Sequence, residues 1–397
     1  MTDRTDRLTA LVAAKFTSPF GFLLDNDSPI PTKQDCDERF PNYMGWWTPI
    51  ENGAFFTGLY LYGLVADEKA AAGRSALIHS LCDALFRLAG AAKEEGFIPR
   101  GLADDGESHY PYGSDDQFCP FVLGLYRLWR SGLADDAEKE KIAALAARLI
   151  AVTKQNGWRY ATDVPGVTRC ACTGGVWREV IPRLFLARAA YEMTKDETWE
   201  ADYRAALAEK PAGSPFSRLE TASFGFAPYM VANPAHAHPW IYQTYHLMQY
   251  ELMLTEDDPA AREAYRRGLI HNGVTALGFN RRFEGAVYGG AFGDWHSLRK
   301  TFDKAENDRD PNGFASRQGR DFDRLTPARR PEHMELSMSL FSAWICLICP
   351  DGSVRAEARR ALDDCYERTP WEDLRMCCAF TAVCALIAST LPDALFQ

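Results

Sequence analysis

The sequence lacks the features that direct a chain to membranes, to nucleic acids or out of the cell. Its longest apolar stretches are shorter than the roughly 18–20 residues that cross a bilayer. The first residues, MTDRTDRLTALVAAKF, have no basic start, no continuous apolar run and no small-residue cleavage site. A net charge of -10 makes nucleic acids and anionic membrane surfaces poor partners. We therefore expect a cytoplasmic protein that binds neither nucleic acid nor membranes.

The sequence also lacks a disulfide framework and the common nucleotide-binding motifs. Its eleven cysteines are an odd number, and most lie in apolar stretches such as residues 376–380 (MCCAF), which is typical of reduced, buried thiols. We find no glycine-rich nucleotide loop, no P-loop and no Ser-His-Asp signature. We accordingly expect neither a cofactor nor a resident metal.

Strand patterns are weak, whereas helical patterns recur in two alternating kinds. Amphipathic helices, with apolar residues at helical spacing on one face, are predicted near residues 3–16, 70–92, 134–155, 196–209, 258–277 and 352–368. Helices that are apolar nearly all round are predicted near residues 52–66, 115–131, 175–194, 236–254, 333–349 and 371–390. An apolar helix must be covered on every side, so six inner and six outer helices predict an all-α (α/α)6 barrel.

The connections between these helices divide into short and long ones. The links from inner to outer helices are short, whereas most links back are long, at about residues 17–48, 93–114, 156–174, 210–235 and 279–331. Long loops in a compact domain are usually functional, and these would all lie at the N-terminal ends of the inner helices. We expect residues 1–397 to form one catalytic domain with a long loop insertion at about 279–331.

Carboxylates mark the starts of the inner helices. Residues 48–51 (TPIE), 114–117 (SDDQ) and 369–372 (TPWE) resemble capping boxes, which would give Glu51, Asp115 and Asp116 a structural role. A first-turn carboxylate can also reach a substrate, and the helix dipole favours its anionic form. A general acid needs a raised pKa, and Asp115, Asp116 and Glu51 from neighbouring helices would supply the like charges for it.

The same loops carry aromatic rings, basic side chains and histidines. Flat rings among polar groups suit sugars, and arginine suits carboxylates. The loop at 279–331 has eleven Lys/Arg and eight Asp/Glu, a net of +3, which indicates an acidic substrate such as a uronate. The predicted substrate-binding residues are Trp46, Trp47, Asn52, Arg100, Tyr110, Trp177, Arg178, His236, Trp240, Trp295, His296 and Arg299. The predicted catalytic residues are Asp116, Asp115 and Glu51, with His109 and His238 assisting.

Two stretches resemble the six-hairpin glycosidase superfamily. One is residues 46–53 (WWTPIENG) with 58–60 (GLY), and the other is residues 96–101 (GFIPRG) followed by 114–117 (SDDQ). The resemblance is to unsaturated glucuronyl and rhamnogalacturonyl hydrolases and to polysaccharide lyases on related barrels. It implies that Asp116 protonates a sugar double bond and activates water. The sequence departs from the rhamnogalacturonyl pattern, because residues 236–240 (HAHPW) stand where an Arg-Gly-Asn-Gly-Trp segment would be expected.

The sequence therefore predicts a glycoside hydrolase that acts on uronate-containing oligosaccharides by carboxylate acid/base catalysis, of the unsaturated uronyl hydrolase type. Three alternatives stay open. A lyase would use His109, Tyr110, His296 and Arg299 to remove a proton beside a uronate. A zinc-dependent cyclase or transferase would bind its metal through Cys170, Cys172, His236 and His238. A glycan-binding toroid without activity would keep the aromatic residues and not need the clustered carboxylates.

Overall fold

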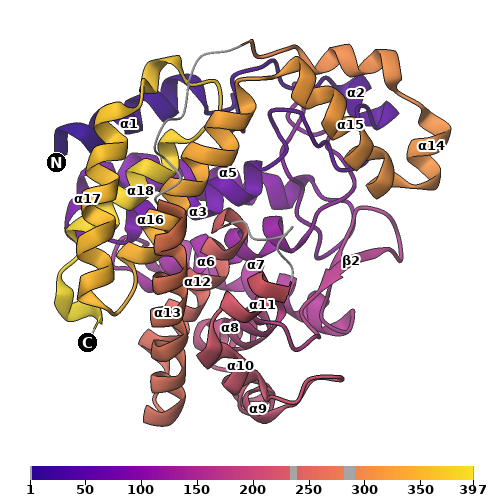
Figure 1. Cartoon of the computed structure of the whole chain (residues 1–397). Helices are drawn as coiled ribbons and strands as arrows, with labels where there is room; N and C mark the ends of the chain where they lie inside the picture. The colour runs from indigo at the N-terminus through magenta and orange to yellow at the C-terminus, as the bar shows by residue number, and fades with distance from the viewer. Residues whose placement is uncertain (1, 233–238, 281–290, 397) are drawn as a thin grey trace.

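The chain is mostly helical, at 68% of its residues. A computed structural model describes residues 2–232, 239–280 and 291–396 (Figure 1). The two strands of the described part, β1 (Arg159–Ala161) and β2 (Thr168–Ala171), pair antiparallel as a small hairpin within the third long connection. The all-α prediction is confirmed, with this hairpin as the one addition among the described residues.

All six apolar helices are present and buried. They are α3 (Gly53–Val65), α6 (Asp115–Arg130), α8 (Trp177–Thr194), α12 (Pro239–Thr255), α16 (Met338–Leu347) and α18 (Ala379–Thr390). Every residue of α3 is buried, as expected for a helix without a polar face. Two of the six begin later than predicted. A π-helical turn, η5 (Arg330–Ser337), precedes α16, and a short 3-10 turn, η6 (Trp371–Asp373), lies before α18.

The six amphipathic helices are also present, and they pack against the apolar ones. They are α1 (Thr2–Lys15), α5 (Ser75–Ala91), α7 (Asp136–Gln155), α9 (Glu197–Ala208), α13 (Pro259–Asn280) and α17 (Gly352–Arg368). Each buries one stripe: in α7 the buried residues include Ile142, Leu145 and Leu149. Shorter turns complete the outer layer at α4 (Glu68–Ala71), η1 (Ala72–Arg74) and η7 (Asp393–Phe396).

The apolar helices contact one another largely in chain order. Helix α3 packs on α6 and α18, α18 on α16, α16 on α12, and α12 on both α8 and α6. Helices α3 and α6 approach most closely, at two glycines. A Cβ at Gly58 would overlap the carbonyl of Pro120, and a Cβ at Gly124 would overlap the backbone of Gly58. This contact packs the middle of α3 directly against the middle of α6.

The long connections contain short helices of their own and pack on each other. These helices are α2 (Lys33–Glu38), α10 (Arg218–Phe224), α11 (Ala227–Ala232), η4 (Trp295–Thr301), α14 (Lys304–Arg309) and α15 (Pro311–Leu325). In Figure 1, α2, α14 and α15 lie together at upper right, away from both chain termini. Hydrogen bonds join the first connection to the last, including Asn42 Nδ2 to Gln318 Oε1 at 3.0 Å. The described part of the predicted insertion at 279–331 is thus mainly helical.

Two further expectations concern the core and the membrane. All eleven cysteines are free thiols and ten are buried, which confirms the prediction from their apolar surroundings. Among the described residues, no helix combines the length and the apolar character that spanning a bilayer requires.

Candidate active site

The three predicted capping boxes are wrong. The Thr48 hydroxyl bonds the Gly45 carbonyl at 2.7 Å, and α3 begins only after Asn52. Ser114 precedes α6 but makes no side-chain cap bond, and the Thr369 hydroxyl closes the end of α17 by bonding the Cys365 carbonyl at 2.6 Å. Capping boxes form instead at Thr32 with Asp35 and at Ser217 with Glu220.

The boxes fail because the side chains of these segments hydrogen-bond to other groups and not to the first N–H groups of a following helix. A capping box needs extended backbone at its first residue and a helix that starts at the next one. Ser114 meets both conditions, but its hydroxyl bonds Arg100 and Asp116 instead. Residues 48–51 form a turn before α3, and within this turn the Glu51 carboxylate accepts the Trp47 N–H at 2.7 Å. Glu51, Asp116 and Gln117 are consequently not occupied in capping.

Arg100 organises the carboxylates at the starts of α3 and α6. Its guanidinium is 3% exposed and donates Nη1 to the Glu51 carbonyl at 2.9 Å and Nη2 to Ser114 Oγ at 2.6 Å. The same Nη2 lies 3.7 Å from Asp116 Oδ1, and Nε donates to the Tyr112 carbonyl at 3.2 Å. One buried cation therefore ties both helix starts to the second long connection.

Glu51 has the properties of a proton donor. Burial raises its pKa, against the opposing charge of Arg329 and the Trp47 N–H, and the nearby Asp116 charge raises it further. Trp47 has a φ of 77°, which is uncommon for a residue other than glycine. Because a general acid must stay protonated near the working pH, the raised pKa suits Glu51 to that role.

Asp116 is a partly exposed carboxylate of the site. Its side chain is 25% exposed, and it accepts a hydrogen bond from the Ser114 hydroxyl. Ser114 in turn accepts from Arg100, so the orientation of Asp116 is set by a two-step chain of polar contacts. A partly exposed carboxylate in this setting is within reach of water or of a substrate hydroxyl, as a general base must be.

Asp115, its neighbour, is held as an anion by buried partners. Arg178 Nη2 donates to Asp115 Oδ2 at 2.7 Å, and the Tyr245 hydroxyl donates to the same oxygen at 2.6 Å. Burial would raise the Asp115 pKa, but the Arg178 charge and these hydrogen bonds outweigh it and lower the pKa. Asp115 therefore positions Arg178 and is a poor proton donor.

Asn52 belongs to a polar network beneath the carboxylates. Its backbone N–H and Nδ2 both donate to Asp25, at 2.6 and 2.7 Å, and its Oδ1 accepts from Gln117 Nε2 at 3.1 Å. Gln117 Oε1 in turn accepts the Phe55 N–H at 3.2 Å. Burial, and then the charge of Glu51, raise the pKa of Asp25 well above its ordinary value. This network joins α3 to α6 below Glu51.

A group of arginines surrounds the carboxylates. Arg169, on β2, bonds Asn312 at 2.6 Å and lies over the Tyr112 ring, while its buried Nη1 has no hydrogen-bond partner within the described parts of the chain. Burial and the nearby Arg100 charge lower the Arg169 pKa. Arg329 acts on Glu51 from the last connection. The unpartnered Nη1 of Arg169 is a donor that an anionic ligand could use.

The predicted aromatic residues divide into covered and partly open rings. Tyr110, Trp177 and Trp295 are at most 2% exposed. They bond, respectively, the Phe40 carbonyl, Gln249 Oε1 at 2.7 Å and the Pro29 carbonyl at 2.9 Å. None of the three exposes enough of its ring to stack on a sugar, although a small part of Trp177 lines a pocket at the start of α8.

Trp46, Trp47 and Trp240 are partly exposed. Trp47 donates Nε1 to the Ala315 carbonyl at 3.2 Å and has Arg329 over its ring, and Trp46 packs edge-on against it. Trp240 packs against Phe55 at a centroid distance of 5.8 Å. Of the six predicted rings, Trp46 and Trp240 are partly exposed and are held mainly by ring contacts, so they are the best candidates for stacking on a sugar.

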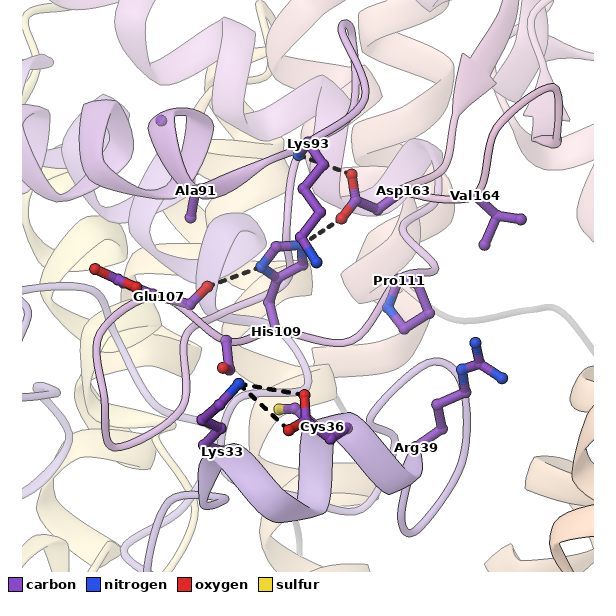
Figure 2. A pocket seen from close by; sticks show the side chains of 13 residues that line it. Lys33, Cys36, Arg39, Ala91, Lys93, Glu107, His109, Pro111, Asp163 and Val164 are labelled. Carbon is purple, nitrogen blue, oxygen red and sulfur yellow. Dashed lines mark hydrogen bonds and ion pairs between the residues drawn. The ribbon is translucent and has the colours of Figure 1, made fainter.

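Three predicted polar residues lie elsewhere in the connections. His109 is fixed at both ring nitrogens, by Asp163 at 2.8 Å and by the Glu107 carbonyl at 3.0 Å, and it lines a separate pocket of about 590 Å³ (Figure 2). His296 stacks on Trp295 and bonds Asp294 at 2.7 Å. Arg299 pairs with Asp35 at 2.7 Å and with Glu38. All three hold connections together.

His236 and His238 lie outside the described residues. Of the other proposed zinc ligands, the Cys172 thiol donates to the Trp158 carbonyl, and Cys170 is partly exposed near Asp115. Within residues 2–232, 239–280 and 291–396, no group of three or more His, Cys, Asp or Glu side chains is arranged to hold a metal ion.

Comparison with known proteins gives no independent assignment. No protein-family model matches the chain, and no curated protein matches it.

Proposed function

We propose that this chain is a glycoside hydrolase that acts on acidic, uronate-containing oligosaccharides, with Glu51 as general acid and Asp116 as general base. The observation that carries the proposal is a pair of carboxyl groups in contrasting environments on one arginine. Arg100 binds the backbone of Glu51 and lies 3.7 Å from Asp116. Pairs of carboxyl groups whose surroundings separate their protonation states are the usual acid/base arrangement of glycosidases.

In the proposed reaction, Glu51 donates its proton to the oxygen of the bond that breaks. Asp116 accepts a proton from a water molecule, whose oxygen forms the new bond to the sugar carbon. Arg169 and Arg178 bind the substrate carboxylate, because a guanidinium offers paired N–H donors to it. Asp115 keeps Arg178 in place and takes no part in proton transfer.

We further propose that the helices close into an (α/α)6 barrel of the six-hairpin type as a single domain. The contacts of α3 with both α6 and α18 support closure, since these are the first, second and last apolar helices. The long connections then lie over the N-terminal end, where Glu51 and Asp116 are. The lyase alternative has less support, because His109, Tyr110 and Arg299 are each engaged by other partners.

The test is incubation with a panel of saturated and unsaturated uronate oligosaccharides, followed by mass spectrometry and by absorbance of the sugar double bond. We expect products that have gained one water. Asp116→Asn and Glu51→Gln should each lower kcat/KM at least about 100-fold, which is the usual contribution of a positioned acid or base. Glu107→Gln, an exposed carboxylate of the same connections, is the matched control. A rise in absorbance without water uptake, or no turnover of any sugar, would contradict the proposal.

A further inference from the structure

A further pocket lies beside Arg178 of the candidate site. It has a volume of about 220 Å³ and lies between the start of α8 and the short helices α10 and α11. Its lining is mostly apolar and includes Val176, Trp177, Phe216, Phe224 and Tyr229. The pocket is too small for an oligosaccharide, since pockets for drug-sized ligands run to about 300–1,000 Å³.

The exposed apolar side chains of the described residues concentrate at this pocket. Seven large hydrophobic side chains are exposed in total, and Val176, Phe216 and Phe224 line the pocket at 37%, 44% and 37% exposure. Val231, at 82%, adjoins the lining residue Ala232. Exposed apolar groups scattered singly need no explanation, whereas a cluster of them around a concave surface indicates a ligand.

Tyr229 connects the pocket to the carboxylates. Its ring lines the pocket, and its hydroxyl hydrogen-bonds the Arg178 side chain. Arg178 holds Asp115 at 2.7 Å, and Asp115 is adjacent in the chain to Asp116. The lining residues Val176 and Trp177 immediately precede Arg178 on the same helix start. A ligand group in the pocket would therefore lie next to the arginine that is proposed to bind the substrate carboxylate.

We propose that this pocket binds an aromatic ring attached to the acidic sugar, so that the preferred substrate is an aryl uronide. Four aromatic residues line it, and two of them, Phe216 and Phe224, already meet edge to face at 4.9 Å with an interplanar angle of 78°. A further aromatic ring could pack against Phe216 and Phe224 with the same edge-to-face geometry. The inference rests on the proposed glycosidase activity for the attached sugar. The pocket is concave and adjoins Arg178, which favours a substrate group as its occupant over a second copy of the chain.

The experiment compares the unsubstituted protein with its Phe224→Ala variant and with a control, Val274→Ala, which removes an exposed apolar side chain from α13 instead. Two measurements are made on each. Binding of 4-nitrophenol, as the ring alone, is followed by ligand-observed NMR. Turnover is measured for a 4-nitrophenyl uronide and the matching methyl uronide. We expect the ring to bind about tenfold more weakly to Phe224→Ala, and the ratio of the two kcat/KM values to fall by about the same factor.

The two measurements separate this inference from the proposed function. Nitrophenol binding that depends on Phe224, with no turnover of any uronide, would support the pocket and overturn the glycosidase. Turnover of the methyl uronide with equal nitrophenol binding to Phe224→Ala and Val274→Ala would overturn the pocket alone. A dimer that Phe224→Ala dissociates, without an effect on nitrophenol, would also overturn it and assign the surface to contact between copies.

Discussion

Asp115 and Asp116 are neighbours in the sequence, but their side chains lie in different surroundings, and a stability measurement can distinguish them. The Asp115 side chain is 9% exposed and pairs with Arg178, which is 24% exposed. Removing one partner of a buried ion pair costs about 3–5 kcal/mol, because the other charge stays buried. Water reaches part of Arg178, so we expect Asp115→Asn to lower the free energy of unfolding by about 3 kcal/mol.

The effect should depend on pH and on Arg178 in a specified way. Because the folded pKa of Asp115 is lowered, its contribution is present above the unfolded pKa and is lost as pH falls through the folded value. The difference between wild type and Asp115→Asn should be constant from pH 5 to 8 and shrink below about pH 4. In Asp115→Asn/Arg178→Met, the loss should be smaller than the sum of the single losses by about 1–2 kcal/mol.

Urea unfolding followed by circular dichroism measures these quantities, with Asp116→Asn as the comparison. The Asp116 side chain is 25% exposed, so its replacement should change stability by less than about 1 kcal/mol while it abolishes turnover. A loss below about 0.5 kcal/mol for Asp115→Asn, or a difference that does not shrink in acid, would refute the assignment of Asp115 as the buried anion.

Three other predictions concern binding, pH and packing. Arg169→Ala should raise the KM for a uronate substrate about tenfold or more and leave the KM for a neutral analogue unchanged. The control in the same kinetic assay is Arg324→Ala, at an exposed arginine. Equal effects on both substrates would contradict the prediction. Burial lowers the pKa of His246 to about 3, so the stability of wild type should rise by about 1.4 kcal/mol per pH unit between pH 4 and 6 from this group. In His246→Leu, the free energy of unfolding measured with urea should lack this rise between pH 4 and 6. Gly58→Ala should cost about 3 kcal/mol or more in urea unfolding, because its methyl would overlap the Pro120 carbonyl, whereas Gly90→Ala, which meets open space, should be neutral or stabilising.

The helices could be predicted from the sequence because their cause is local. An unbroken apolar surface such as that of α3 can only be buried, and a striped surface such as that of α7 buries one face. The boundaries were less predictable where tertiary contacts override the helix signal. Residues 371–378 have the composition of a helix, yet Met376 pairs with Asn26 as an isolated bridge and α18 starts only at Ala379.

The candidate site was predictable only in part. Glu51, Arg100, Asp116 and Arg178 could be proposed from the sequence because they stand at predicted helix starts or in the loops before them. Their partners Asp25 and Tyr245 were missed, since Asp25 lies in a loop 27 residues before Asn52, and Tyr245 is one of several tyrosines within α12. The capping-box interpretation failed for a related reason, because a four-residue pattern does not contain the distant donors, such as Arg100, that compete for its side chains.

The most direct test of Glu51 as the proton donor is the pH dependence of kcat/KM for wild type and Glu51→Gln on the uronate substrate that the panel identifies. A general acid with a raised pKa is lost as pH rises through that pKa, so wild type should show a fall in kcat/KM on the basic side of its optimum. The account predicts that Glu51→Gln has a far lower kcat/KM and no such fall. The same basic-side fall in Glu51→Gln as in wild type would contradict it and assign proton donation to another group.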